Sequence, residues 1–245
     1  MAITKVKYKD KIFPISYKIV NPSASSSILF LHGWGSNKEI MEQAFKDKDT
    51  KLIFVDMPGF GQSVNEDTIL TTKDYANIIS LFLEQTNQNP NIIAGHSFGG
   101  KVATLLNPKC LVLLSSAGIL VPKPLGVRLK IALFKALKPF GGAKLRKIFV
   151  SNDAKEMNEA MYETFKNVVD EDFKEEFKKY RGKALLFWGE DDSATPLWTA
   201  KEINRLISNS KLYPLKGDHY FFLQHGKYIL EKIKSECKDI NGDIN

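Results

Sequence analysis

The chain has 245 residues, of which 43% are hydrophobic and 26% are charged, as in ordinary globular proteins. This composition excludes wholesale disorder, a collagen-like repeat and a coiled coil, and the length allows one large domain or two small ones. Lys and Arg exceed Asp and Glu by 35 to 28 and are scattered along the chain without zinc-ligand spacing or a basic tail, so we expect no nucleic-acid partner.

The cysteine count and the apolar segments predict the cellular compartment of the protein. Cys110 and Cys237 are too few for a disulfide framework, and we expect both thiols to be reduced. The N-terminal sequence lacks the apolar region of a secretory signal, and the longest apolar stretch, 111–121, is shorter than the roughly 20 residues that span a bilayer. We therefore expect a soluble cytoplasmic protein.

Strand and helix patterns alternate along the chain. Residues 3–8 and 13–20 predict a hairpin around a Lys-Asp-Lys turn. The segments with strand character that follow are short and apolar, as in buried parallel strands: 27–32, 51–56, 91–96, 111–115 and 184–188, with a weaker last strand at 211–215. Helical patterns occupy 73–86, 101–106, 197–207 and the region around 228–233. This order predicts an α/β fold with a mostly parallel sheet of about eight strands and helices on both faces.

One helix start has a recognisable signature. Thr195 precedes Pro196, which predicts Thr195 as the N-cap and Pro196 as the first residue of the helix at 197–207.

The alternation of strand and helix patterns is interrupted between the strands at 111–115 and 184–188. A crossover connection needs only a dozen or so residues, and this segment is far longer. We predict an inserted helical cap at 118–181, with residues 1–117 and 182–245 forming the core domain.

The first half of this predicted cap is strongly basic. Residues 118–150 contain no acid but eight cations: Lys123, Arg128, Lys130, Lys135, Lys138, Lys144, Arg146 and Lys147. The favoured interpretation is a cap helix with solvated lysines. The alternative is a lid that meets an anionic acyl substrate or an acidic membrane surface.

The strongest chemical signal is Gly95-His96-Ser97-Phe98-Gly99, a G-x-S-x-G between a predicted strand and a predicted helix. A serine at such a turn exposes its hydroxyl, and glycines two residues away on each side leave room for the sharp backbone. Leu31-His32-Gly33-Trp34-Gly35 follows another buried strand. Acyl transfer needs two donors aimed at the oxyanion, and the backbone N–H groups of Trp34 and Phe98 are the candidates.

A nucleophilic serine needs a base, and the base needs an acid that orients it. Of the four histidines, His32 and His96 lie within the motifs above, where we expect them to shape turns, and His225 reads as a surface residue. His219, in a loop between the last strand and the last helix, is the candidate base.

The candidate acid lies in the loop Gly189–Pro196. Asp192 gives the form G-x-x-D-x-x-x-P, and Asp191 stays open as the alternative because a loop can slip by one residue. The order Ser97, Asp192, His219 is that of one hydrolase fold.

Together these motifs resemble the α/β-hydrolase superfamily, in its group with a helical cap. HGWG, DMPGFGQS at 56–63, GHSFGG, WGEDDSATP and GDHY occur in order at the expected strand ends, over about residues 25–117 and 182–235. The resemblance implies Ser97 as nucleophile, His219 as general base, Asp192 as its acid, and Trp34 and Phe98 as oxyanion donors. It implies a structural turn at Asp56-Met57-Pro58-Gly59.

The resemblance also narrows the reaction. Relatives that open epoxides or remove halides attack with an aspartate at this turn, so a serine favours acyl chemistry. We expect a serine hydrolase that cleaves a carboxylic ester, or a related acyl bond, of a small molecule through an acyl-enzyme, without a metal or organic cofactor. Alternatives are a carbon–carbon hydrolase of the meta-cleavage type, which Tyr220 after His219 makes less favoured, and a non-catalytic small-molecule receptor. Substrate and oligomeric state are not predicted.

Overall fold

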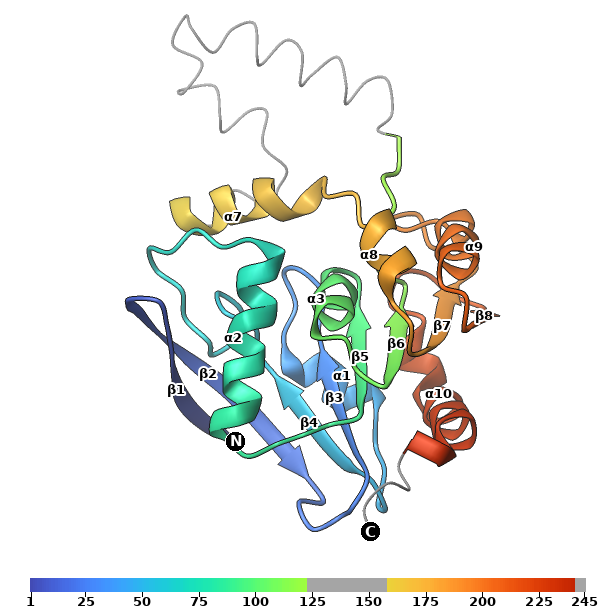
Figure 1. Cartoon of the computed structure of the whole chain (residues 1–245), viewed down its shortest axis with the longest axis horizontal. Coiled ribbons are helices and arrows are strands. Elements are labelled where there is room, and N and C mark those ends of the chain that lie inside the picture. Colours follow the sequence, from blue (N-terminus) through green and yellow to red (C-terminus); the bar gives the residue numbers. More distant parts are fainter. Residues whose placement is uncertain (123–157, 241–245) are drawn as a thin grey trace, which may run out of the picture.

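A twisted eight-stranded sheet forms the centre of the protein in a computed structural model that describes residues 1–122 and 158–240 (Figure 1). All eight predicted strands are present, each within two residues of its predicted ends. They are β1 (Ala2–Tyr8), β2 (Lys11–Val20), β3 (Ser27–Leu31), β4 (Lys51–Val55), β5 (Ile92–His96), β6 (Cys110–Leu114), β7 (Lys183–Gly189) and β8 (Ser210–Leu215).

The strand order is β1-β2-β4-β3-β5-β6-β7-β8. The hairpin β1–β2 is antiparallel, β2 pairs with β4 antiparallel, and all remaining pairs are parallel. The predicted α/β fold with a mostly parallel sheet is therefore confirmed. Because parallel strands end at one edge, the loops after β3, β5, β6, β7 and β8 gather at the same edge of the sheet.

Helices cover both faces of the sheet (Figure 1). One face carries α2 (Thr72–Gln85), α3 (Phe98–Leu106) and α9 (Leu197–Leu206), and the other carries α1 (Lys38–Ala44) and α10 (Phe222–Glu236). Each face has its own apolar core, as expected for strands buried on both sides. The sequence did not predict α1, because a helix of seven residues is too short to show an apolar period.

The helix α2 shows why these segments become helical. Its buried side chains, Tyr75, Ile78, Ile79 and Phe82, recur at the helical period and face the sheet. At its start, the Thr71 hydroxyl accepts the N–H of Asp74 while the Asp74 carboxylate accepts the N–H of Thr71, which is a complete capping box.

The predicted N-cap of α9 is wrong by one residue. Pro196 is the N-cap, with extended backbone at φ −56° and ψ 149°. The Thr195 side chain does not cap the helix because its hydroxyl donates to the Asp192 carboxylate, 2.8 Å away.

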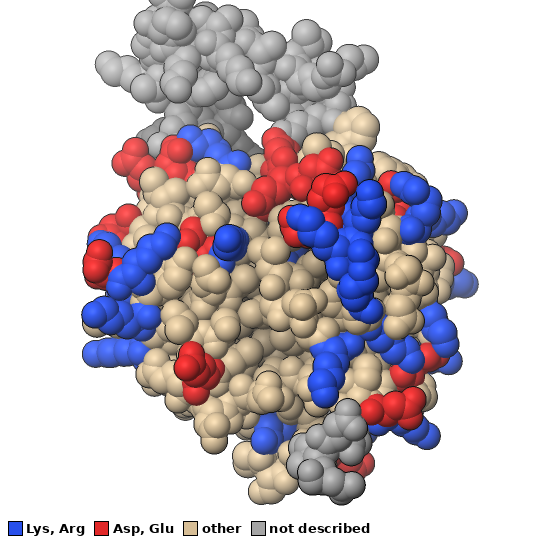
Figure 2. Space-filling model, in the orientation of Figure 1, with Lys and Arg blue, Asp and Glu red and all other residues tan. Residues whose placement is uncertain are grey.

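Two helices lie in the part of the predicted cap range that the structure describes. They are α7 (Glu159–Val169) and α8 (Lys174–Lys179), and in Figure 1 they run across the edge at which the parallel strands end. Acidic side chains gather along this upper edge in Figure 2. The predicted cap boundaries stay a prediction, and the eight basic residues between 123 and 147 lie outside the described residues.

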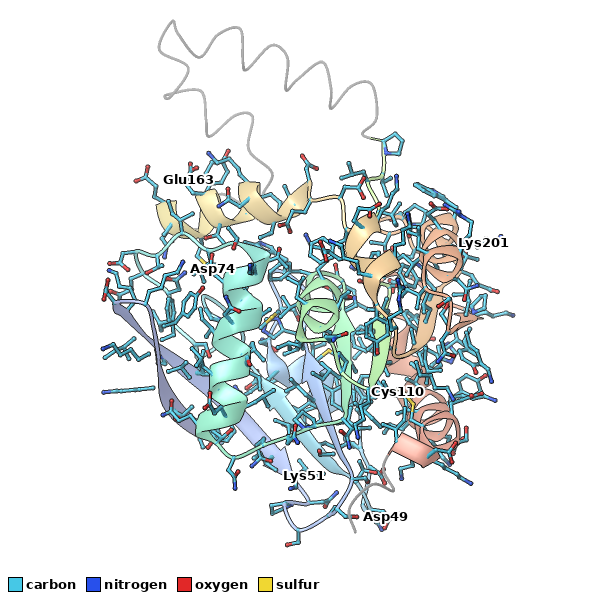
Figure 3. All side chains as sticks on the ribbon, in the orientation of Figure 1. Asp49, Lys51, Asp74, Cys110, Glu163 and Lys201 are labelled. Atoms are coloured by element: carbon cyan, nitrogen blue, oxygen red, sulfur yellow. A yellow bond between two sulfur atoms is a disulfide. The ribbon has the colours of Figure 1, made fainter. Side chains whose placement is uncertain are left out.

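The expectation of reduced thiols is wrong in this structure. Cys110, at the start of β6 and labelled in Figure 3, forms a disulfide with Cys237 at the end of α10. The two residues are 127 positions apart, and only the packing of α10 against the sheet brings their Cα atoms to 6.8 Å. Sequence spacing could not show that proximity.

Among the residues that the structure describes, no helix combines the length and the apolar character that crossing a membrane requires.

Candidate active site

Ser97 occupies a sharp turn between β5 and α3. Its backbone has φ 50° and ψ −114°, a conformation that residues other than glycine rarely adopt. Two neighbours hold this geometry: the Ser97 N–H donates to Leu114 O on β6 at 3.1 Å, and the Ser97 carbonyl accepts the Ala117 N–H at 3.1 Å. From Ile92 to Gly100 every residue is buried except Ser97, so the turn presents this side chain at the strand edge.

The glycines on each side of Ser97 are required by contact. A Cβ on Gly95 would lie 2.2 Å from Gly99 O, and a Cβ on Gly99 would lie 2.5 Å from the carbonyl oxygens of Leu31 and His32. The start of α3 therefore packs directly on the end of β3. This contact puts the loop after β3 beside the serine, as the motif spacing predicted.

The structure brings His219 and Asp192 together. His219 Nδ1 lies 2.7 Å from Asp192 Oδ2, and the Asp192 side chain is fully buried. The carboxylate also accepts the N–H groups of Ala194 and Thr195 at 2.8 and 2.9 Å. Burial alone would raise the pKa of Asp192, but the hydrogen bonds from His219 and Thr195 outweigh it and lower the pKa to about 2. Asp192 is therefore a carboxylate at neutral pH and can orient the Nδ1–H of His219.

The alternative acid, Asp191, has a different place. It is exposed, and its backbone N–H donates to Gly217 O at 3.0 Å. Of the two candidate acids, Asp192 is therefore the one in contact with His219.

His96 connects Ser97 to the loop of His219. Its Nε2–H donates to the backbone carbonyl of His219 at 3.0 Å, and the two rings lie 4.6 Å apart. Complete burial and the neighbouring His219 lower the pKa of His96 to about 3, so the ring is neutral. The residue before the candidate nucleophile therefore supports the backbone of the candidate base.

The loop after β3 lies against the same turn. A Cβ on Gly33 would come within 2.8 Å of His96 Nδ1 and 3.2 Å of Ser97 Cβ. His32 stabilises this loop, since its Nε2 accepts the Met57 N–H at 3.0 Å and its Nδ1–H donates to Gly33 O at 2.8 Å. Burial lowers the pKa of His32 to about 4, which matches a ring that must keep a lone pair on Nε2.

Trp34 follows Gly33 and is packed among aromatic rings. Its ring centroid lies 4.9 Å from Phe60, 5.5 Å from Phe98 and 5.3 Å from Phe165 on α7. The side chains of Trp34 and Phe98, the residues whose backbone N–H groups are the predicted oxyanion donors, are therefore in direct contact. The turn, the His219–Asp192 pair and this loop form one site at the carboxyl edge of the sheet.

Comparison with known proteins identifies the family of the chain. Residues 28–231 match the profile of the Alpha/beta hydrolase family. The chain belongs to this family. It is 29% identical, over 242 residues, to the AB hydrolase superfamily protein YisY of Bacillus subtilis, covering 84% of this chain and 87% of that relative.

Solved hydrolase structures share the fold of this α/β-hydrolase. A thermophilic esterase from Thermogutta terrifontis superposes with a TM-score of 0.76 at 13% identity, covering 98% of this chain and 100% of the esterase. An esterase from Exiguobacterium antarcticum gives a TM-score of 0.74 at 22% identity, covering 96% and 99%. Identities this low establish the fold and leave the substrate open.

Two buried lysines of this α/β-hydrolase were missed by sequence reasoning. Lys38 Nζ lies 2.7 Å from Asp56 Oδ2, and the same carboxylate accepts the Lys38 N–H at 2.7 Å and the Gln62 N–H at 3.0 Å. This pair holds the turn at 56–63, in agreement with the structural role that the resemblance implied for it. No local sequence signal identifies Lys38 as buried, because a lysine at the start of a helix is normally expected to be exposed to solvent.

The second is Lys101, one helical turn after Ser97. Its ammonium pairs with Glu171 Oε2 at 2.9 Å, donates to Val168 O and lies over the rings of Phe98 and Phe173. Glu171 also accepts the Thr72 hydroxyl, so one carboxylate joins α2, α3 and the turn between α7 and α8. These contacts attach α7 and α8 to the helix that carries the serine.

One surface cavity has a volume of about 460 Å³ and is lined by Ile119, Leu120, Pro122, Lys174, Trp198, Lys201, Glu202 and Arg205. None of Ser97, Asp192 and His219 lines it, so we assign it no part in the chemistry. Within 1–122 and 158–240, no group of three His, Cys, Asp or Glu side chains is arranged to hold a metal ion.

Proposed function

We propose that this α/β-hydrolase is a serine hydrolase that cleaves a carboxylic ester, or a related acyl bond, of a small molecule through an acyl-enzyme. The observation that carries the proposal is the 2.7 Å contact between His219 Nδ1 and the buried Asp192 Oδ2. His96, the residue before Ser97, hydrogen bonds to the backbone carbonyl of His219 and so connects the loop of His219 to β5. A base oriented by an ionised acid, next to a serine in a strained turn, is the arrangement that activates a hydroxyl nucleophile.

The reaction follows from these roles. His219 Nε2 takes the proton of Ser97 Oγ as the oxygen attacks the substrate carbonyl, and the N–H groups of Trp34 and Phe98 donate to the oxyanion. His219 then gives that proton to the departing alcohol, which leaves an ester of Ser97. A water molecule attacks this ester with His219 again as base, and the acid is released. Asp192, whose pKa is lowered to about 2, stays ionised throughout.

The positions of α7 and α8 support a cap function for residues 118–181. In Figure 1 both helices cross the strand edge at which the site lies, and Phe165 of α7 contacts Trp34. We propose that α7 and α8 form one wall of the substrate site and set acyl-chain preference.

A fluorophosphonate probe tests the proposal directly. The probe should label Ser97 and no other serine, and Ser97→Ala should abolish labelling and lower ester turnover about a thousandfold or more. Ser116→Ala is the matched control, since it removes a buried hydroxyl that donates to Ala117 O beside the same turn. Labelling at Ser115 or Ser63 would contradict the assignment.

A series of activated esters of increasing acyl length then defines the substrate class. Decay of a coloured dienol-ketone without ester turnover would favour the carbon–carbon hydrolase. Tight ligand binding with neither turnover nor labelling would favour the receptor.

A further inference from the structure

The Thr195 hydroxyl contacts the oxygen of Asp192 that His219 uses. Thr195 Oγ1 lies 2.8 Å from Asp192 Oδ2, and His219 Nδ1 lies 2.7 Å from the same oxygen. Asp192 Oδ1 accepts the two backbone N–H groups of Ala194 and Thr195. Thr195 thus supplies two of the donors to this carboxylate, which also has a side-chain hydrogen bond with Ser115.

The Thr195 hydroxyl has two acceptors within hydrogen-bonding distance, and only one of them is charged. Thr195 Oγ1 lies 2.8 Å from the Asp192 carboxylate and 3.2 Å from the backbone carbonyl of Ser115. A single proton goes to the nearer acceptor that carries a charge. Thr195 is only 7% exposed, so water offers little competition for this bond.

We propose that Thr195 is a positioning residue of the triad, whose hydroxyl holds the Asp192 carboxylate in the orientation that accepts the Nδ1–H of His219. The proposal rests on the hydrolase mechanism proposed above. Two backbone N–H groups hold Oδ1, while the Thr195 hydroxyl and His219 Nδ1 both contact Oδ2. Without the hydroxyl, the carboxylate loses a buried side-chain donor on the oxygen that His219 contacts and can rotate away from the imidazole.

The hydroxyl also shares the negative charge on Oδ2. Removing a donor to a carboxylate concentrates charge on its oxygens, and a carboxylate with more charge stabilises the protonated imidazole more strongly. Loss of the Thr195 hydroxyl should therefore move the acid limb of the pH–activity profile to higher pH while it weakens the geometry.

The other groups around His219 do not produce a competing change in the acid limb of the pH–activity profile. His96 from β5 is neutral at assay pH because burial lowers its pKa to about 3. Tyr220 follows in the same loop, with its ring 5.7 Å from that of His219, and Asp218 precedes it with its carboxylate accepting the Tyr220 N–H. Asp192 is the carboxylate in contact with the ring.

The test uses three variants of the full chain. Thr195→Val removes the hydroxyl and keeps the shape, Thr195→Ser keeps the hydroxyl, and Thr199→Val removes another buried hydroxyl, which donates to Pro196 O in the first turn of α9. For Thr195→Val we expect kcat on an activated ester to fall about tenfold with KM little changed. The acid limb of its kcat/KM profile should move to higher pH. Thr195→Ser and Thr199→Val should follow the wild-type profile.

A second readout does not need turnover. The Nδ1 proton of His219, observed by ¹H NMR in ¹⁵N-labelled protein, should move in Thr195→Val and return to its wild-type position in Thr195→Ser. If ester turnover is absent in the wild type but this proton responds as stated, the positioning role stands and the proposed reaction fails. If Thr195→Val leaves both the proton and the pH profile unchanged, and alters only thermal stability, the positioning role is overturned.

Discussion

His96 donates its Nε2–H to the backbone carbonyl of His219 at 3.0 Å, across 123 positions of sequence. The residue that precedes the proposed nucleophile therefore holds the loop of the proposed base. Because His96 is the last residue of β5 and Ser97 follows it directly, any shift of the His219 loop relative to the strand must break this bond.

His96→Asn tests that link. Asparagine is shorter than histidine, so the donor to His219 O is lost, and we expect ester turnover to fall about tenfold, in proportion to one buried hydrogen bond. His225→Asn is the matched control, because His225 Nε2 donates to the carbonyl of Lys216 in the same loop at 2.9 Å but from a more exposed position. Equal losses of turnover in the two variants would show that both histidines only stabilise the His219 loop, and that the link from His96 has no specific role.

Asp192→Asn tests the acid. The amide keeps the shape of the carboxylate but cannot hold the imidazole as Asp192 does, so we expect turnover to fall on the order of 10³- to 10⁴-fold. Asp191→Asn, which changes an exposed neighbour, should change turnover less than twofold. Steady-state kinetics on one ester would give the ranking, and the reverse order would remove Asp192 from the mechanism.

Stability should decrease as the solution is acidified below neutrality. The pKa values of the buried His32 and His96 are lowered to about 4 and about 3, against about 6.5 in an unfolded chain. Between these limits the unfolded chain binds more protons, so the free energy of unfolding is complete above about pH 6.5 and falls toward pH 4. The slope should approach about 1.4 kcal/mol per pH unit for each histidine.

Urea unfolding at several pH values measures this slope. His96→Asn should reduce the slope by the share of one histidine, whereas Asp192, with its pKa near 2, adds a loss only below about pH 4. A free energy of unfolding that stays level from pH 7 to pH 4.5 would contradict the neutral, buried state of both rings.

The two buried lysines should differ in their effect on stability. Lys38→Met leaves Asp56 as an unpaired carboxylate that is 0% exposed, and we expect a loss of about 3–5 kcal/mol. Lys101→Met leaves Glu171, whose side chain is 32% exposed and can be hydrated, so the loss should be smaller. Chemical denaturation of both variants decides this, and a larger loss for Lys101→Met would refute the argument from burial.

Local sequence was sufficient for the strands and for naming the candidate site residues. Short apolar runs predicted β3 to β7, because a strand buried on both faces needs apolar residues at consecutive positions. The hairpin pattern predicted β1 and β2. The glycines around Ser97 identified the turn, because backbone contact at Gly95 and Gly99 leaves no space for a side chain. His219 and Asp192 could be named because a triad needs both residue types in loops after strands.

Other features depend on contacts between distant segments. The choice of Asp192 over Asp191, the disulfide between Cys110 and Cys237, and the buried partners of Lys38 and Lys101 have no local signature. Thr195 shows the reason most clearly: its position before Pro196 predicted a helix cap, but the folded loop offers its hydroxyl a charged acceptor at 2.8 Å. The sequence by itself determined the strands, the serine turn and the order of the candidate site residues, whereas tertiary structure alone decided which polar groups meet, since that depends on distances in space.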